Sequence, residues 1–238
     1  VILISSFTTL LYSQDAELFA KIEKQVEQNI ESDLEMYKYL HQNPELSFQE
    51  KETSSRIAGE LKALGFEVTE KIGGFGVVGI LKNGEGPVIM LRTDLDALPI
   101  EEQTGLTYAS EVRSEIDGNE VPVMHACGHD MHMSSFVGTA KIMTSLKDDW
   151  SGTLFMLGQP AEERGGAKYV LEDGLFDRFP LPNMAFAYHV DPTLEAGKIG
   201  YIPGPAWAKV NTIEITVRGL GGHGARPHQA IDPVVLSA

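Results

Sequence analysis

The chain of 238 residues contains 42% hydrophobic and 22% charged residues, a balance typical of a globular protein with a substantial core in one or two domains. Its 34 acidic and 19 basic residues give a net charge of −15 without any basic block, which argues against a nucleic-acid partner. The single cysteine excludes an internal disulfide framework.

The first residues, Val1–Tyr12, form an apolar run that precedes a charged sequence. This run is too short to span a membrane. Its composition is that of the hydrophobic part of a secretory signal, so we expect residues 1–14 to be the remnant of a signal peptide and the protein to be exported, to the periplasm or as a secreted protein. The alternative is a first buried helix or strand of a cytoplasmic protein.

Helical spacing of apolar residues between Asp15 and Leu40 predicts one long amphipathic helix with an acidic outer face. The residues with this spacing are Leu18, Ile22, Val26, Ile30, Leu34 and Tyr37. Pro44 ends the helix, because proline cannot continue it. We interpret His41, just before this break, as a structural residue.

The spacing of Ser47 and Glu50 is that of a capping box, which predicts a second helix that ends near Leu64. Strands are then predicted at 67–71, 77–81 and 88–91, with Gly-rich and Asn-Gly turns between them. A polar stretch at 102–123 is expected to form a flap beside the site. The later predicted elements are a helix at 130–146, a strand at 152–158, a helix at 165–173 and a strand at 182–188.

Three of the seven histidines lie close to the only cysteine, in the run Met124–His132. Cys127 and His129 are two positions apart, so on an extended backbone their side chains share a face and can bind one ion. Thiolate and imidazole, with carboxylates, are the groups that hold a borderline-soft divalent metal. A small apolar cysteine at the start of a helix is the alternative interpretation. For His125 and His132 we expect hydrogen-bonding or core roles.

Glu162 and Glu163 follow an apolar strand and a proline. Two adjacent side chains diverge where the backbone leaves a strand. One carboxylate can then bind a metal while its neighbour acts as a general base on the attacking water. A solvated loop is the alternative for an isolated pair of this kind.

The motifs Arg92-Thr-Asp-Leu-Asp-Ala-Leu-Pro99, His125-x-Cys-Gly-His-Asp-x-His132, Gln159-Pro-Ala-Glu-Glu163 and Gly221-Gly-His-Gly-Ala-x-Pro227 follow one another in the chain. Together they resemble motifs of the amidohydrolase branch of the dinuclear metallopeptidase superfamily, which includes aminoacylases, hippurate hydrolases, auxin-conjugate hydrolases and related carboxypeptidases. The resemblance implies an α/β catalytic domain, residues 15–202, with a mixed, mainly parallel sheet flanked by helices. It also implies the start of an inserted α+β lid or dimerisation domain at 203–238.

The resemblance implies a centre with two divalent metal ions, zinc or manganese, with cobalt or nickel as alternatives. The ligands that it assigns in this chain are Cys127, His129, Glu163 and His189. Glu162 is then the general base. Asp94 stands where the wider superfamily has a metal-binding histidine, a part that His129 takes over. The next acid, Asp96, is expected to orient a ligand rather than to bind metal.

The sequence changes character after a hinge at Pro203–Pro205. A strand is predicted at Lys209–Arg218, and a helix is predicted to begin at Pro227. The resemblance implies that this lid forms a homodimer and that His223, in the Gly-rich turn between these elements, polarises the scissile carbonyl in a neighbouring subunit's site. Family members continue beyond this point to a further metal-binding histidine, so we expect this chain to be an N-terminal fragment, inactive by itself.

The resulting hypothesis is a metal-dependent amidohydrolase that releases an amino acid from an N-acyl conjugate. A dipeptidase or carboxypeptidase of the same superfamily, acting on short peptides, is one alternative. A non-catalytic metal-binding module is another, and an enzyme that uses Cys127 as a nucleophile is a third. The Cys-Gly-His-Asp motif favours the amidohydrolase, and the intact Glu162 favours catalysis.

Overall fold

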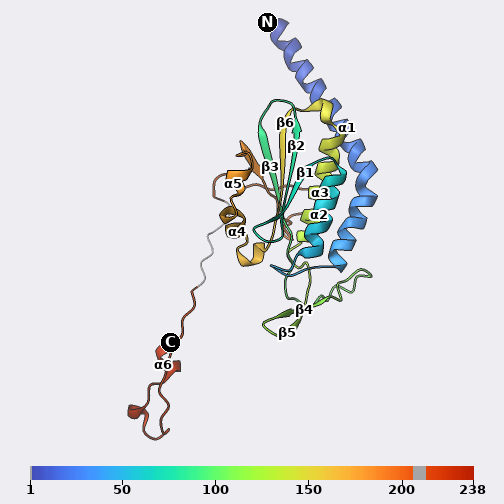
Figure 1. Cartoon of the computed structure of the whole chain (residues 1–238). Helices are drawn as coiled ribbons and strands as arrows, with labels where there is room; N and C mark the ends of the chain where they lie inside the picture. Colours follow the sequence, from blue (N-terminus) through green and yellow to red (C-terminus); the bar gives the residue numbers. More distant parts are fainter. Residues whose placement is uncertain (1, 206–212) are drawn as a thin grey trace. The chain divides into compact units, whose positions relative to one another are not determined.

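The computed structural model describes residues 2–205 and 213–238, with side chains from Ala16 onward in these ranges. Contacts divide the chain into two units, 1–191 and 192–238. The helices of the first unit (Figure 1) are α1 (Ile2–Gln42), α2 (Lys51–Ala63), α3 (His129–Ser145), α4 (Ala167–Glu172) and α5 (Leu175–Arg178). Its strands are β1 (Glu67–Ile72), β2 (Gly76–Asn83), β3 (Val88–Asp94), β4 (Arg113–Ile116), β5 (Asn119–Pro122), β6 (Gly152–Gln159) and β7 (Met184–Phe186).

A five-stranded mixed sheet, in the order β1-β2-β6-β3-β7, forms the centre of the first unit. β2 pairs antiparallel with β1 and β6, whereas β3 pairs parallel with β6 and β7. The helices α1, α2 and α3 lie on one side of this sheet, and α4 and α5 lie on the other (Figure 1). The predicted mixed sheet flanked by helices is confirmed. Its parallel pairs are the two that β3 forms, with β6 and with β7.

The central strands β2 and β6 are buried on both faces, which explains their nearly continuous apolar sequences. Successive side chains of a strand point to opposite faces. Leu154 and Met156 of β6 therefore pack with residues of α1, α2 and α3, whereas Phe155 and Leu157 pack with residues of α4 and α5. Each fully buried side chain of this size contributes about 1.5–3 kcal/mol, so the two cores fix the register of the central strand.

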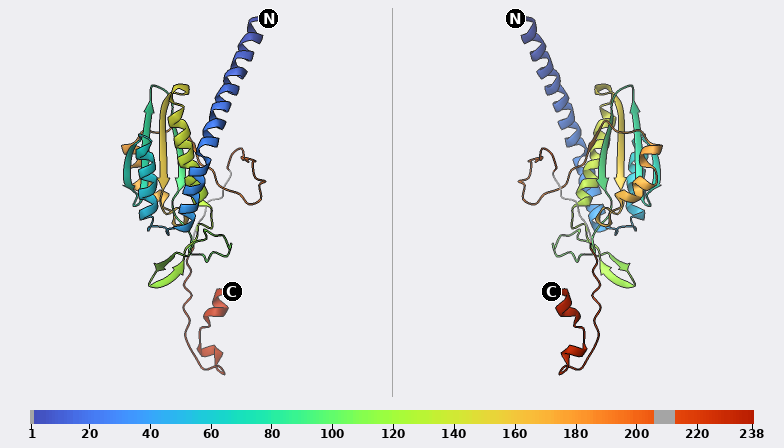
Figure 2. Two further views of the ribbon diagram at one scale, coloured as in Figure 1. Left: turned by 90° about the vertical axis from the view of Figure 1, so that its right-hand side faces the viewer. Right: turned by 90° about the vertical axis from the view of Figure 1, so that its left-hand side faces the viewer.

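α1 packs against α3 (Figure 2). Ser134 Oγ donates a hydrogen bond to the carbonyl oxygen of Asp33 at 2.6 Å, and Lys141 Nζ donates to Asp33 Oδ1 at 2.7 Å. The long helix predicted between Asp15 and Leu40 is thus confirmed and forms part of the helical layer over the sheet.

The apolar stripe of α1 is less buried than its amphipathic pattern suggests. Val26, Ile30 and Leu34 are 43%, 44% and 45% exposed, whereas Met36 and Leu40, near the end of the helix, are 3% and 1% exposed. Of the part of the helix whose side chains are described, from Ala16 onward, only the last turns therefore enter the core. Among the described residues, none of the helices combines the length and the apolar character that crossing a membrane requires.

The strands β3, β6 and β7 run in the same direction, so their carboxyl ends meet at one edge of the sheet. The register pairs Asp94 at the end of β3 with Gln159 at the end of β6. The segments that follow these strands therefore begin side by side, although they lie far apart in the sequence.

The predicted capping box at the start of α2 is wrong. Glu50 is the residue before the helix, but its side chain makes no capping hydrogen bond. Glu45 supplies the cap instead, because its carboxylate accepts hydrogen bonds from the N–H groups of Glu52 at 3.1 Å and Thr53 at 2.7 Å. The side chains of Ser47 and Glu50 bind loops at the carboxyl edge of the sheet.

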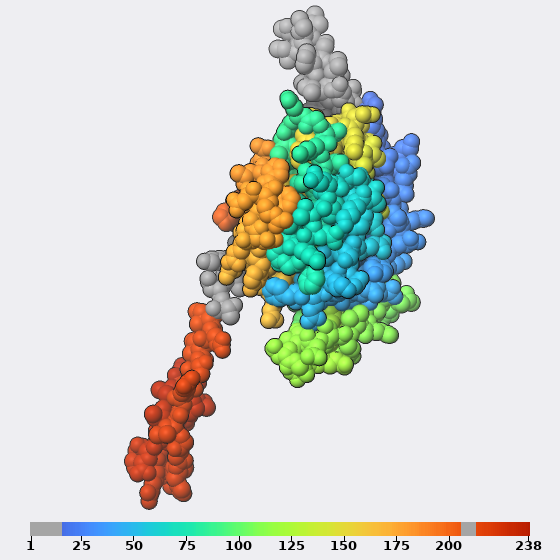
Figure 3. Space-filling model, viewed as in Figure 1, coloured from blue at the N-terminus to red at the C-terminus, as the bar shows by residue number. Residues whose placement is uncertain are grey.

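The polar stretch 102–123 contains an antiparallel hairpin of β4 and β5. In Figure 3 this stretch, in lime green, forms a lobe at one end of the first unit. Leu98 and Met124 pair in a single antiparallel bridge, which holds the two ends of the lobe together. The sequence predicted this excursion, and its action as a flap stays a prediction.

The second unit contains a short 3-10 helix, Pro227–Gln229, and a short helix, α6 (Pro233–Ser237). The strand predicted at Lys209–Arg218 lies partly outside the described residues, and from Ile213 onward it is wrong. A strand needs a neighbour to satisfy its backbone groups, and the described part of this unit has only one bridge, between Leu220 and Ile231. The helix predicted from Pro227 is divided, because Asp232 caps a new helix that starts with a proline.

Replacing Glu45 by alanine should lower the free energy of unfolding by about 1 kcal/mol, because two N–H groups at the start of α2 lose their acceptor. Urea unfolding followed by circular dichroism measures this change. Glu52→Ala, which removes an exposed carboxylate from the same turn, is the control and should cost less than about 0.5 kcal/mol. Equal losses in the two variants would show that Glu45 is not the cap.

Candidate metal centre

Three side chains from two separate segments meet at the carboxyl edge of the sheet. Cys127 precedes α3, His129 is the first residue of that helix, and His189 follows β7. Cys127 Sγ lies 3.3 Å from His189 Nε2. The ligand atoms of all three residues lie within 4.8 Å of one another, close enough to hold one metal ion. These are three of the four residues that were predicted as ligands, and the fourth, Glu163, lies beside His129, with its Oε1 3.9 Å from His129 Nε2.

Gly128 sets the geometry between Cys127 and His129. Its backbone is left-handed, with φ 81° and ψ 20°, so the two side chains converge through a tight turn and not through the extended backbone that their spacing suggested. A Cβ atom at this position would lie 2.4 Å from Val190 Cγ2. Glycine therefore permits both the turn and the close approach of the segment that carries His189.

His129 is held in one tautomer. Its Nδ1 lies 2.8 Å from the carbonyl oxygen of Asp96, so in the neutral imidazole Nδ1 donates and Nε2 carries the lone pair. That Nε2 atom is buried without a hydrogen-bond partner. A carbonyl behind the far nitrogen is the usual arrangement of a metal-binding histidine, so the orphaned Nε2 fits a cation.

The Asp96 carboxylate is fully buried behind this histidine. Its Oδ1 accepts from the N–H of Glu162 at 3.0 Å, and its Oδ2 accepts from the N–H of Glu163 at 3.1 Å and from Ser47 Oγ at 2.6 Å. Burial alone would raise the pKa of Asp96, but the bonds from His129, Ser47 and the Glu163 amide lower it. The contacts support the predicted orienting role of Asp96.

The backbone after β6 turns sharply at Ala161, whose φ of 51° and ψ of 41° are left-handed, and then forms a 3-10 turn at Glu162–Arg164. Glu162 Oε2 and Glu163 Oε1 each lie 3.9 Å from His129 Nε2. The two carboxylates therefore diverge less than the sequence suggested. Glu163 Oε1 is buried without a partner, whereas the side chain of Glu162 is 39% exposed, so Glu162 is the better placed to meet a substrate.

The cluster is electrostatically unfavourable for a thiolate when no cation is bound. Burial raises the pKa of Cys127 to about 12, and the charges of Glu163, Glu162 and Asp94 add to this effect. Burial, Asp94 and Glu163 likewise raise the pKa of Glu162. A divalent cation would reverse the effect on Cys127 by favouring the thiolate.

Asp94, which was not predicted as a ligand, lies in the same cluster. Its Oδ2 is 3.6 Å from His129 Nε2 and 3.4 Å from His132 Nδ1, and this group of three could also hold an ion. His132 Nε2 accepts the N–H of Val190 at 3.1 Å, so the proton of His132 is on Nδ1 and faces Asp94. That tautomer favours the hydrogen-bonding role expected for His132.

His41 joins the start of α3 to the 102–123 lobe. Its Nδ1 lies 2.6 Å from Asp130 Oδ2, and its Nε2 lies 3.0 Å from Glu102 Oε1. Burial lowers the pKa of His41, but the bonds to Glu102 and Asp130 outweigh it and raise the pKa. His125 differs, because burial lowers its pKa to about 3 and keeps it neutral. The spacing of residues gave no signal for the contacts of His41.

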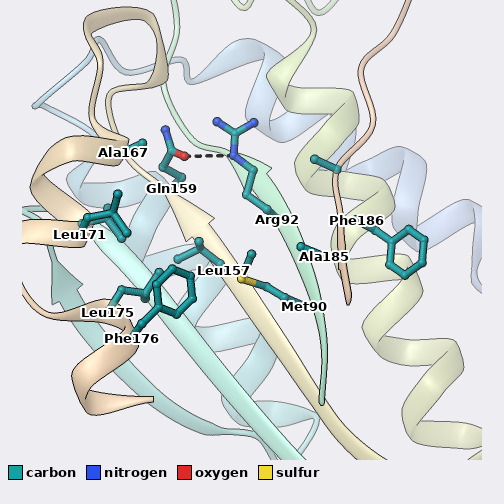
Figure 4. Close-up of a pocket in the computed structure, with 12 residues that line it drawn as sticks. Met90, Arg92, Leu157, Gln159, Ala167, Leu171, Leu175, Phe176, Ala185 and Phe186 are labelled. Carbon is teal, nitrogen blue, oxygen red and sulfur yellow. Dashed lines mark hydrogen bonds between the residues drawn. The ribbon is translucent and has the colours of Figure 1, made fainter. Parts of the chain in front are cut away.

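A pocket of about 290 Å³ lies on the face of the sheet that carries α4 and α5, among these helices and the strands β3 and β7 (Figure 4). Its walls are mostly apolar. Arg92 and Gln159 form its polar end, where Arg92 Nε donates to Gln159 Oε1 at 3.1 Å. Arg92 also forms an ion pair with Asp94, so the arginine connects this pocket to the metal cluster.

His223 belongs to the second unit. Its Nδ1 accepts the N–H of Ala225 at 3.2 Å, so the proton of the neutral ring is on Nε2, which is then a hydrogen-bond donor. This tautomer suits the predicted role of polarising a carbonyl oxygen. The role itself stays a prediction.

Comparison with known proteins places this arrangement in one family. Residues 90–237 match the model of Peptidase family M20/M25/M40. The chain is 42% identical over 210 residues to the N-acetylcysteine deacetylase of Bacillus subtilis. The matched region covers 86% of this chain and 52% of that protein. It is 42% identical over 201 residues to the hippurate hydrolase of Campylobacter jejuni, at 84% and 50% coverage. A solved structure from Bacillus subtilis is described as a dinuclear metal-binding peptidase of the M20 family. It is 39% identical to this chain with a TM-score of 0.64, and the matched region covers 73% of this chain and 47% of the solved chain.

A mixed α/β sheet with cysteine, histidine and glutamate side chains at its carboxyl edge is an arrangement that can hold divalent metal ions. The chain belongs to peptidase family M20/M25/M40. The chain spans about half the length of the curated relatives it matches.

The raised pKa of Cys127 predicts slow alkylation of the metal-free chain by iodoacetamide at neutral pH. The rate should keep rising with pH and show no plateau near the ordinary thiol value of about 8.5, because only the thiolate reacts. The same chain in denaturant is the control, since it has a single cysteine and should show the ordinary titration. Rapid alkylation of the folded, metal-free chain at pH 7 would contradict the predicted pKa and would favour a nucleophilic cysteine.

Proposed function

We propose that the complete protein is a metal-dependent amidohydrolase that cleaves the amide bond of N-acyl amino acids. The observation that carries this proposal is the position of Glu162, an accessible carboxylate next to a cluster of side chains that could hold a metal ion. Relatives named N-acetylcysteine deacetylase, hippurate hydrolase and, in Geobacillus stearothermophilus, N-acyl-L-amino acid amidohydrolase support the substrate class.

The donor set fits divalent metal ions. The orphaned Nε2 of His129 and the orphaned Oε1 of Glu163 are buried atoms that a cation would satisfy. We assign Cys127, His129, Glu163 and His189 as the ligands, with zinc favoured slightly over manganese by the thiolate. Two bound ions would polarise the substrate carbonyl and lower the pKa of water to about 7.

Glu162 would act as the proton carrier of the reaction. Its side chain is 39% exposed, so it is accessible to water and substrate. Its carboxylate takes a proton from the attacking water, a C–O bond forms at the carbonyl, and the same proton passes to the nitrogen of the breaking C–N bond. The products are a carboxylate and a free amino acid.

His223 would assist from the lid by donating its Nε2–H to the carbonyl oxygen, which becomes negatively charged during the attack. We propose that this contact is made across a homodimer of the complete protein. Export of the protein, suggested by the apolar start of the chain, also remains a proposal.

A carboxypeptidase acting on short peptides is the second candidate. The chain is 36% identical over 226 residues to a protein of Saccharolobus solfataricus named thermostable carboxypeptidase 2. A panel of N-acyl amino acids and dipeptides with the same C-terminal residue separates the two candidates. A higher kcat/KM for the dipeptides would replace the first proposal by the second.

Glu162→Gln in the complete gene product should lower kcat by about 100-fold or more, because the variant loses its proton carrier. Elemental analysis should find the metal content unchanged, since Glu162 is not an assigned ligand. Glu172→Gln, on the exposed face of α4, is the matched control and should retain both activity and metal. Intact turnover by Glu162→Gln would overturn the assignment.

Cys127→Ala should lose bound metal, because it removes the thiolate from the group formed with His129 and His189. Elemental analysis of this variant, of the present chain and of the complete gene product checks the centre. We expect about two ions in the complete protein, as in dinuclear hydrolases, and fewer in the variant. Absence of metal from the complete protein, purified without chelators, would contradict the proposal.

A further inference from the structure

Glu50 is a buried carboxyl group without an evident structural purpose. It is fully buried, and its Oε2 has no hydrogen-bond partner. It does not cap α2, although it precedes that helix. Its Oε1 accepts a hydrogen bond from the N–H of Ala161 at 2.6 Å, across a separation of 111 residues. Burying a carboxyl group with one unsatisfied oxygen destabilises a protein, so such a group calls for an explanation.

The residue that Glu50 contacts has a strained backbone. Ala161 is left-handed, with φ 51°, a conformation that L-residues adopt only where their surroundings hold them in it. This turn separates the end of β6 from Glu162 and Glu163. Its φ and ψ angles therefore determine where the two carboxylates point.

Glu50 and Asp96 divide the amides of this turn between them. The Ala161 N–H donates to Glu50, and the next two N–H groups, of Glu162 and Glu163, donate to the two oxygens of Asp96. Three consecutive amides are thus held by two buried carboxyl groups from other parts of the chain. The loop closes on itself as well, because the N–H of Gly166 donates to the carbonyl oxygen of Ala161 at 2.7 Å.

We infer that Glu50 is a positioning residue, which holds the strained turn at Ala161 so that Glu162 and Glu163 keep their working positions. The inference rests on the proposed function, since Glu162 matters for the rate only if it carries the proton. The contact through which Glu50 acts is the hydrogen bond that it accepts from the Ala161 N–H, since no cation pairs with it among the described residues. Burial raises the pKa of Glu50 to about 7.

Two variants of similar size distinguish the effect of the hydrogen bond from the effect of the side chain's volume. Glu50→Gln keeps an acceptor for the Ala161 N–H, whereas Glu50→Met fills the space without one. Thr53→Val, another buried position of α2, is the control for disturbance of this helix. All variants are made in the complete gene product and compared at a temperature at which circular dichroism shows each of them folded.

Hydrogen exchange of the Ala161 amide in metal-free protein is the first measurement. It should be fast in Glu50→Met and slow in wild type, Glu50→Gln and Thr53→Val. The second is the kinetics of the metal-loaded enzyme. There kcat should fall by about 100-fold in Glu50→Met with KM nearly unchanged, because a small displacement of a catalytic group affects the transition state most. Glu50→Gln should keep kcat within about 3-fold of wild type, since its hydrogen bond remains.

Unchanged exchange at Ala161 in Glu50→Met would overturn the inference, and so would an unchanged kcat in that variant. An equal loss of kcat in Glu50→Gln and Glu50→Met would also overturn it, because the hydrogen bond would then not be what matters. If the wild-type protein hydrolyses no amide but Glu50→Met still loses protection at Ala161, the proposed function fails and the link between Glu50 and the turn stands.

Discussion

The site depends on one buried carboxylate. Asp96 receives the N–H groups of Glu162 and Glu163 and the hydroxyl of Ser47, and its own carbonyl oxygen fixes the tautomer of His129. Hydrogen bonds that order both the acids and the imidazole thus come from one residue in the segment after β3. Without Asp96, the strands would still meet at this edge, but no shared hydrogen-bond acceptor would fix the positions of His129, Glu162 and Glu163 relative to one another. The parallel pairing of β3 with β6 and β7 is what brings these segments together.

Sequence reasoning found the parts of the site whose chemistry is local. Cys127 and His129 are recognisable because two ligand types lie two residues apart beside a glycine, and the Glu162–Glu163 pair is recognisable because it follows a buried strand. His189 is different, since a single histidine after a strand has no pattern, and only the resemblance to a family assigned it. The mixed sheet and its flanking helices were also predictable, because strand and helix periodicities differ clearly.

Other features could not be read from spacing, because they depend on which segments the fold brings together. Glu45 caps α2 in place of the expected Ser47 and Glu50, and no local pattern distinguishes these three polar residues in the segment before the helix. Asp94 lies in the site because of the strand register, which pairs it with Gln159 and places it near His129 and His132. The exposure of Val26, Ile30 and Leu34 on α1 shows the same limit, since amphipathic spacing identifies an apolar stripe but not what covers it.

The acidic surroundings of Cys127 also bear on oxidative damage. Peroxide attacks the thiolate, not the thiol, so the burial and the carboxylates that raise the pKa of Cys127 to about 12 would slow oxidation of the sulfur when no cation is bound. This protection matters because the chain has no second cysteine with which a sulfenic acid could condense. The negative charge that would favour a bound cation would therefore also preserve the thiol of Cys127, a candidate ligand.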